Sequence, residues 1–331
     1  MKKAIIAVSI AVWSVVALLV IALLITSALG KDFSIGGKSF MINFGGGNVT
    51  LLREEKLTLD GTTMLDVGAT YQDIRIRVTD GNQATVRHYD YENAEPCAVS
   101  DSGGTVSVNA NWRFSINLFT FNFTESPRLE IELPSSYAGN VSFVTTSGTV
   151  RAEGDAAWGD TVLQSTSGSV NTDGTLVCRD LRAKSASGSV NLNRDVTGAV
   201  VQVSSTSGSV HLKGNTKCDE LSVQSTSGSV HIKKCEVAGG VRLKSTSGSI
   251  NHESEIRAKE ITAETMSGSV GMGSLDAEGL IHLKSTSGSV RADAVRSPEH
   301  YIRSTSGSIR IQVLTGTGEV RSTSGSVKTN F

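Results

Sequence analysis

The chain has 331 residues, a formal net charge of −1 and only 5% aromatic residues. A net charge near zero gives no electrostatic reason to expect a nucleic-acid partner, and so few aromatic residues are unusual for an enzyme with a bulky core. Glycine is frequent, with 34 residues, but regularly spaced Val, Ile and Leu argue against a disordered chain.

The first predicted element is an uncharged apolar segment at residues 4–29, long enough for a helix that crosses a membrane. Lys2 and Lys3 precede it, so the positive-inside rule leaves residues 1–3 as a cytoplasmic stub. We expect a single-pass protein of the cell membrane whose C-terminal domain is extracytoplasmic. The alternative is a cleaved signal peptide with small residues Ala28 and Gly30 at the cleavage site, although signal peptides usually have a shorter apolar region.

Residues 31–140 are β-rich but irregular. The runs LTLDG, IRIRVTDG, TVSVNA and LEIELPSSY alternate apolar and polar residues and end in turn residues. We expect them to form the N-terminal part of a solenoid. The unusual part is residues 112–123, an aromatic segment that would either cap the open end of the solenoid or form an apolar patch for a partner or the membrane. Its candidate binding residues are Trp112, Phe119, Phe121 and Phe123.

Residues 141–331 contain ten close copies of S-T-S-G-S-V. Their glycines are spaced by twenty residues seven times, then by nineteen and by eighteen. Such a strict period is typical of a stacked solenoid. The predicted corner glycines are Gly148, Gly168, Gly188, Gly208, Gly228, Gly248, Gly268, Gly288, Gly307 and Gly325.

One repeat, residues 241–260, shows how a rung is built. Val241 and Leu243 alternate with Arg242 and Lys244, which indicates a strand with one buried face. The glycine follows at a sharp corner, where either a positive φ or a close approach between rungs excludes a side chain. Stacked copies would pair in parallel about 4.8 Å apart, with right-handed connections. The sequence therefore predicts an all-β, right-handed parallel β-solenoid with rungs of about 20 residues, preceded by one transmembrane helix.

The Ser and Thr hydroxyls of the corner are expected to stabilise the stack. A nucleophilic serine needs a base and an orienting partner, and no His or Asp recurs in register with the motif. We predict no catalytic residue and no cofactor.

A partial basic column lies four residues before the glycines. It could contact anionic wall polymers or lipid headgroups, or it could simply be a solvated face. Its members are Lys184, Lys244, Lys284, Arg303 and Arg321.

Two histidines, His211 and His231, lie three residues after their glycines and should stack on neighbouring rungs. No third metal ligand is evident, so we favour a ladder with the asparagines of the same column over a metal site. The four cysteines contain no CxxC pair, and we expect buried or turn thiols without a disulfide.

The run RLEIELPSSYAGNVSFVTTSGTV, followed by T-S-G-S-V units to the C-terminus, resembles the bacterial DUF4097/DUF4098 “putative adhesin” family of β-strand repeat proteins, which includes LiaG-like membrane proteins. The resemblance covers about residues 50–331. It implies a parallel β-solenoid and an adhesin-like role, and the family has no catalytic residues to transfer.

We therefore predict a membrane-anchored, non-enzymatic extracytoplasmic scaffold that is adhesin-like or binds the cell envelope. Its partner would be a cell-wall polymer, a host surface or a membrane protein, and not nucleic acid. We also expect that two such rods can associate end to end, because no polar capping element follows Gly325. The alternatives are an accessory or sensor component of an envelope-stress response and a polysaccharide-acting β-helix enzyme. The enzyme is disfavoured because rung length is fixed and the acidic residues are scattered.

Overall fold

The structure is a computed structural model that describes residues 48–92, 94–110 and 125–330, and the backbone of three short strands, β1 (Phe33–Ile35), β2 (Lys38–Asn43) and β9 (Phe114–Asn117). All regular secondary structure in these residues is β-strand. No helix that could cross a membrane is found among them. The all-β solenoid is confirmed. The predicted membrane segment, residues 4–29, lies outside the described residues.

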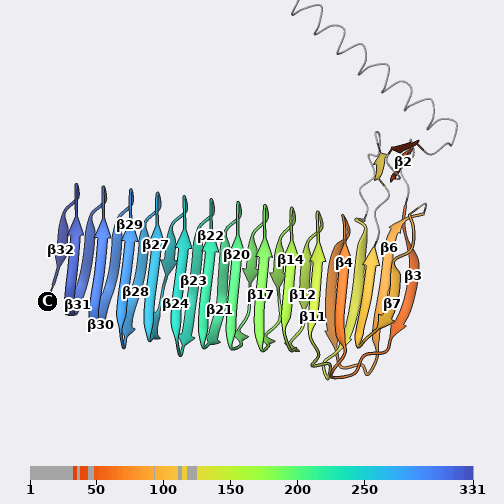
Figure 1. Cartoon of the computed structure of the whole chain (residues 1–331), viewed down its shortest axis with the longest axis horizontal. Coiled ribbons are helices and arrows are strands. Elements are labelled where there is room, and N and C mark those ends of the chain that lie inside the picture. Colours follow the sequence, from red (N-terminus) through yellow and green to blue (C-terminus); the bar gives the residue numbers. More distant parts are fainter. Residues whose placement is uncertain are drawn as a thin grey trace, which may run out of the picture.

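Residues 141–330 form a rod of stacked rungs (Figure 1), in which each strand pairs in parallel with its copy one repeat later. The strands before the corner form the first column. They are β11 (Val141–Thr145), β14 (Thr161–Ser165), β17 (Asp180–Ser185), β20 (Val200–Ser205), β22 (Glu220–Ser225), β24 (Gly240–Ser245), β27 (Glu260–Thr265), β29 (Leu280–Ser285) and the later parts of β30 (Val290–Ser304) and β31 (Ile309–Ser322).

Two more columns complete each rung. The second follows the corner and contains β12 (Val150–Glu153), β15 (Val170–Thr172), β18 (Val190–Leu192), β21 (Val210–Cys218), β23 (Val230–Val237), β25 (Ile250–His252), β28 (Val270–Ala277), the beginnings of β30 and β31, and β32 (Val327–Thr329). The third contains β13 (Ala156–Ala157), β16 (Leu176–Val177), β19 (Val196–Thr197), β26 (Glu255–Ala258) and the later parts of the long strands that span both columns.

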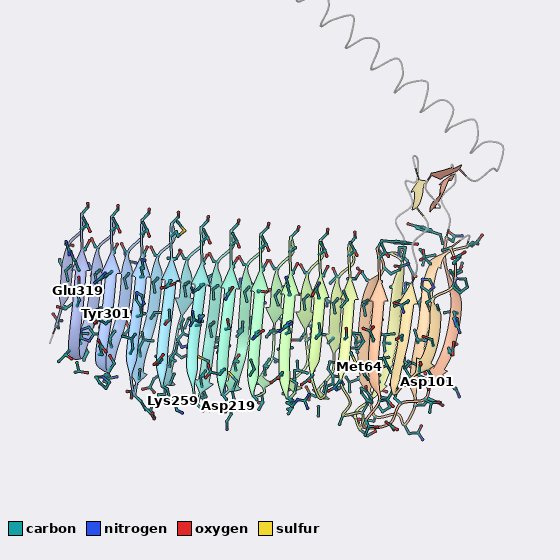
Figure 2. All side chains as sticks on the ribbon, in the orientation of Figure 1. Met64, Asp101, Asp219, Lys259, Tyr301 and Glu319 are labelled. Carbon is teal, nitrogen blue, oxygen red and sulfur yellow. The ribbon has the colours of Figure 1, made fainter. Side chains whose placement is uncertain are left out.

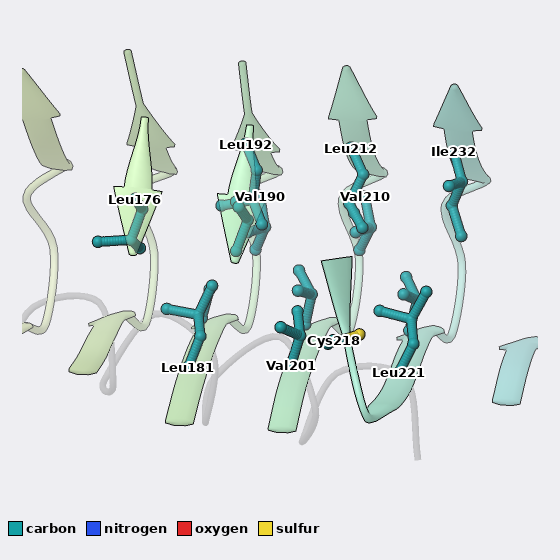
Figure 3. Packing of buried hydrophobic residues seen from close by; sticks show 14 of the residues in the cluster. Leu176, Leu181, Val190, Leu192, Val201, Val210, Leu212, Cys218, Leu221 and Ile232 are labelled. Carbon is teal, nitrogen blue, oxygen red and sulfur yellow. The ribbon is translucent and has the colours of Figure 1, made fainter. Parts of the chain in front are cut away.

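The core is a narrow line of aliphatic side chains along the rod axis. Figure 3 shows Leu181, Val201 and Leu221 of the first column facing Val190 and its equivalents in the second. These side chains are 0–1% exposed. Burying an aliphatic side chain of this size contributes roughly 1.5–3 kcal/mol, so each rung gains stability only when a neighbour covers it.

The N-terminal rungs do not stack in the order of the sequence. Strands β4 (Met64–Ala69) and β5 (Asp73–Thr79) form the rung that pairs in parallel with β11 and β12. The next rung outward is formed by β8 (Thr105–Ala110) on β4 and β10 (Arg128–Pro134) on β5. Strands β8 and β10 thus take the places in this rung that β4 and β5 take in the neighbouring one.

Antiparallel strands close this end of the described stack. Strand β7 (Ala98–Ser102) pairs with β8, β6 (Ala84–Tyr91) pairs with β10, and β3 (Val49–Leu57) pairs with β6. The reversal of strand direction ends the parallel series. A further small sheet joins β1, β2 and β9.

Candidate functional site

The repeated corner is held together by a serine or threonine hydroxyl three residues before each glycine. The Ser225 hydroxyl donates to the carbonyl oxygen of Gly208, one rung earlier, at 2.9 Å, and accepts the N–H of Gly228 at 3.0 Å. The same pair of bonds recurs along the rod, with Thr145 and Thr265 in place of serine in two rungs. The motif is therefore a structural device that links each corner to the previous one.

The corner glycines are required by close approach. A Cβ on Gly228 would lie 2.3 Å from the carbonyl oxygen of Gly208, and the other corners are equally tight. None of the ten has a positive φ. Of the two reasons that the sequence left open, the structure supports the approach between rungs.

The outward side chains on either side of this serine or threonine form a polar groove. The groove has a volume of about 630 Å³ and runs across strands β17 to β29 of the first column. One side is the column four residues before the glycine. The other is the row of corner residues two before it, most of them exposed and here called the corner ridge. The groove residues are Lys184, Ser204, Gln224, Lys244, Glu264 and Lys284, and the ridge residues beside them are Thr206, Thr226, Thr246, Met266 and Thr286.

The predicted basic column forms one continuous register but carries mixed charge. Lys184 is separated from Lys244 by two neutral rungs, and Glu264 lies between Lys244 and Lys284. Lys244 Nζ is 3.2 Å from Glu264 Oε2. No carboxylate of the described residues lies within ion-pair distance of Lys184 or Lys284.

The column continues beyond the groove in Arg303 and Arg321. Arg303 pairs with Glu319 and lies over the Tyr301 ring at 6.0 Å. Tyr301 and Glu319 are neighbours on the last two rungs (Figure 2).

Sequence reasoning missed the second basic column of the same face. Arg182 and Arg242 lie six residues before their glycines, on the rungs that carry Lys184 and Lys244. Both arginines are exposed, and neither forms an ion pair within the described residues. The signal was present in the sequence as the pattern Arg-x-Lys, which occurs twice directly before the buried serine.

The histidine ladder lies on the second column. Asn191 donates to Asn171 Oδ1 at 2.8 Å, and His211 Nδ1 lies 3.0 Å from Asn191 Oδ1. The His211 and His231 rings stack with centroids 5.0 Å apart. Burial, with the nearby His231 and Lys213, lowers the pKa of His211. Within the described ranges no group of three or more metal-ligating side chains occurs.

A buried polar cluster in the N-terminal rungs was not predicted. Asp90 Oδ2 accepts hydrogen bonds from Tyr71 at 2.7 Å and Gln72 at 2.8 Å, and lies 3.2 Å from His88 Nε2. His88 Nδ1 accepts the N–H of Cys97, which leaves its Nε2–H to donate to Asp90. Burial alone would raise the pKa of Asp90, but these hydrogen bonds outweigh it and hold the pKa below its usual value.

The four cysteines are buried and free. Burial raises the pKa of Cys97 to about 11 and the pKa values of Cys178, Cys218 and Cys235 to about 12. Thiols of such high pKa are poor nucleophiles, so these residues contribute packing. The aromatic candidates Trp112, Phe119, Phe121 and Phe123 lie outside the described residues, and only the backbone of β9 is placed within that segment.

These features define a parallel β-solenoid whose repeated motif builds corners and whose outer columns vary. The family model described as Toastrack DUF4097 matches residues 62–253 and 243–331. The chain therefore belongs to the DUF4097 family, as the resemblance of its repeats indicated.

Three solved structures are among those to which the chain is similar. A “putative adhesin” from Parabacteroides merdae is 12% identical, with a TM-score of 0.45, and the match covers 88% of this chain and 99% of that one. A “putative adhesin” from Parabacteroides distasonis is 13% identical, with a TM-score of 0.40, covering 87% and 100%. A “putative lipid binding protein” from the same species is 13% identical, with a TM-score of 0.31, covering 88% and 100%. No curated protein matches the sequence.

Proposed function

We propose that the protein is a non-enzymatic, adhesin-like rod that binds a polymer or surface of the cell envelope. The observation that carries this proposal is the groove beside the corner ridge. It presents similar polar chemistry on successive rungs and exposes cations that have no partner within the described part of the rod.

Repetition suits such a surface to a repeating ligand. Neighbouring rungs are about 4.8 Å apart, so a polymer bound at one rung is held close to the next. Linked weak contacts raise the overall affinity through effective concentration without a strong individual site. The exposed ion pairs and lysines of the groove are each weak, which fits a binding mode based on many contacts.

Residues 4–29 would hold this rod at the membrane. The apolar length of the segment and the two lysines before it support a signal-anchor with the rod outside the cell. The same orientation would place the groove among wall polymers or facing a host surface.

Co-sedimentation with bacterial cell-wall sacculi tests the proposal. Full-length protein in detergent micelles is expected to pellet with the sacculi at low ionic strength and to be released as salt is added, because exposed charges are screened. Absence of pelleting at low salt would contradict envelope binding. Release of soluble sugars from the sacculi by the purified protein would contradict the non-enzymatic assignment.

A further inference from the structure

We infer that the groove between the basic column and the corner ridge binds an extended anionic glycan whose chain runs along the rod axis. This inference rests on the proposed function and names the chemical class of its ligand. It follows from the direction of the groove, from the charges along it and from the hydroxyls of its walls.

The groove has the direction of a linear polymer. Its lining extends across six consecutive rungs, from Lys184 on β17 to Lys284 on β29. Five rung intervals at about 4.8 Å give a length of about 24 Å. A polymer chain that lies in the groove along the rod axis would cross the strands at a right angle. It would contact the same position of the repeat on each rung.

The charge of this face favours an anion. Lys184 and Lys284 have no carboxylate partner within the described residues. Arg182 and Arg242 lie two residues further from the corner on the same face, outside the groove, and Arg242 shares a second hollow with Glu220 and Glu260. Glu264 is the acidic residue that lines the groove, and it is shared by Lys244 at 3.2 Å and His282 at 3.7 Å. The excess positive charge is local, since the whole chain has a net charge of −1.

The neutral positions favour a sugar polymer over other anions. Between Lys184 and Lys244 the groove presents Ser204 and Gln224, and the ridge beside them presents Thr206 and Thr226. Hydroxyl and amide groups donate and accept hydrogen bonds, as sugar hydroxyls do. Charged rungs separated by neutral hydrogen-bonding rungs therefore suit a glycan that carries both anionic and hydroxyl groups.

Polygalacturonate oligomers provide a glycan probe with carboxylates, and phosphomannan oligomers provide a glycan probe with phosphates. We expect the full-length protein in micelles to bind at least one of them in a salt-dependent manner. The triple variant Lys184→Gln, Lys244→Gln, Lys284→Gln should weaken that binding at least about tenfold. The matched control Lys213→Gln, Lys217→Gln, Lys233→Gln removes the same charge from other exposed faces and should change binding much less.

Two single variants test the groove without removing a cation. Glu264→Gln frees Lys244 and should tighten binding about fivefold. Gln224→Trp fills the middle of the groove at an exposed position and should abolish binding while thermal unfolding stays unchanged.

The inference is overturned if the lysine triple variant and its control behave alike, or if Gln224→Trp binds normally. Equally tight binding of duplex DNA by the wild type would also overturn the assignment to glycans. If the triple variant loses both glycan probes but still pellets with sacculi, envelope binding stands and the groove is not its site. If the wild type binds the probes but never pellets with sacculi, the groove remains a binding site for anionic glycans and the proposed function fails.

Discussion

Replacing one corner glycine by alanine measures how closely neighbouring rungs approach. In Gly228→Ala the new methyl group would lie 2.3 Å from the Gly208 carbonyl oxygen, so the rungs must separate locally. We expect a destabilisation of about 1–3 kcal/mol, seen as a lower denaturation midpoint. Gly61→Ala is the control, because a Cβ there has no neighbour within 4 Å. Equal midpoints for the two variants would contradict the role assigned to the corner.

The corner serine can be tested by a substitution that the protein itself supplies. Ser225→Ala leaves the Gly208 carbonyl and the Gly228 N–H without their buried partner, which should cost about 1–3 kcal/mol. Ser225→Thr should be nearly neutral, because Thr265 makes the equivalent bonds at 2.9 and 3.2 Å in its own rung. Chemical denaturation of both variants checks the difference. If threonine is as damaging as alanine, the hydroxyl is not what the corner needs.

Strand β25 carries a histidine at an inward position that neighbouring rungs fill with aliphatic residues. His252 pairs in register with Ile232, its ring contacts the Ile232 carbonyl oxygen at 2.9 Å, and its Nε2 has no partner within the described residues. Burial lowers the pKa of His252 below 6.5. The unfolded chain therefore binds the proton more readily, and stability is lost as the pH falls below about 6.5.

His252→Leu should remove this part of the pH dependence. Leucine matches Leu212 in the same column, so the variant should be at least as stable as the wild type at pH 7.5. At pH 5.5 the difference in stability between the variant and the wild type should be larger, because protonation of the buried His252 ring then destabilises the wild type. Thermal unfolding at the two pH values gives the comparison. An equal loss of stability in both proteins would show that other groups carry the acid sensitivity.

The strand columns could be predicted from the sequence because every repeat places the same residue types at the same distance from its glycine. The order of the N-terminal rungs could not. Strands β4 and β8 pair although β5, β6 and β7 separate them in the chain, and no local pattern encodes that arrangement. The basic column was predicted, but the groove was not, since it depends on how the corner ridge stands beside that column. The ion pair between Lys244 and Glu264 is a contact between rungs that becomes visible only with the stacking register.

At the scale of the whole molecule, the rod joins two parts with different construction. The regular rungs repeat one corner, whereas the N-terminal rung replaces the corner glycine by Gln72, whose carbonyl oxygen accepts the Thr145 hydroxyl at 3.1 Å. The Gln72 side chain then donates a hydrogen bond to Asp90 on β6. Strand β6 belongs to the antiparallel strands β3, β6 and β7 that close the N-terminal end of the described stack, here called the cap. This residue therefore links the cap to the first regular rung, and stability in such a stack passes from neighbour to neighbour.

Asp90→Asn should loosen the cap while leaving the distant rungs intact. The carboxylate accepts from Tyr71, Gln72 and His88 on one oxygen and from the Tyr91 N–H on the other, so an amide NH₂ must face at least one donor. Two buried donors that face each other without an acceptor cost about 1–3 kcal/mol of stability. Hydrogen exchange should therefore quicken in β5, β6 and β10 and stay slow in β20 to β29. Asp66→Asn, at an outward position of β4, should leave all of these amides unchanged. Faster exchange along the entire rod in Asp90→Asn would instead mean that the cap and the regular rungs unfold as one unit.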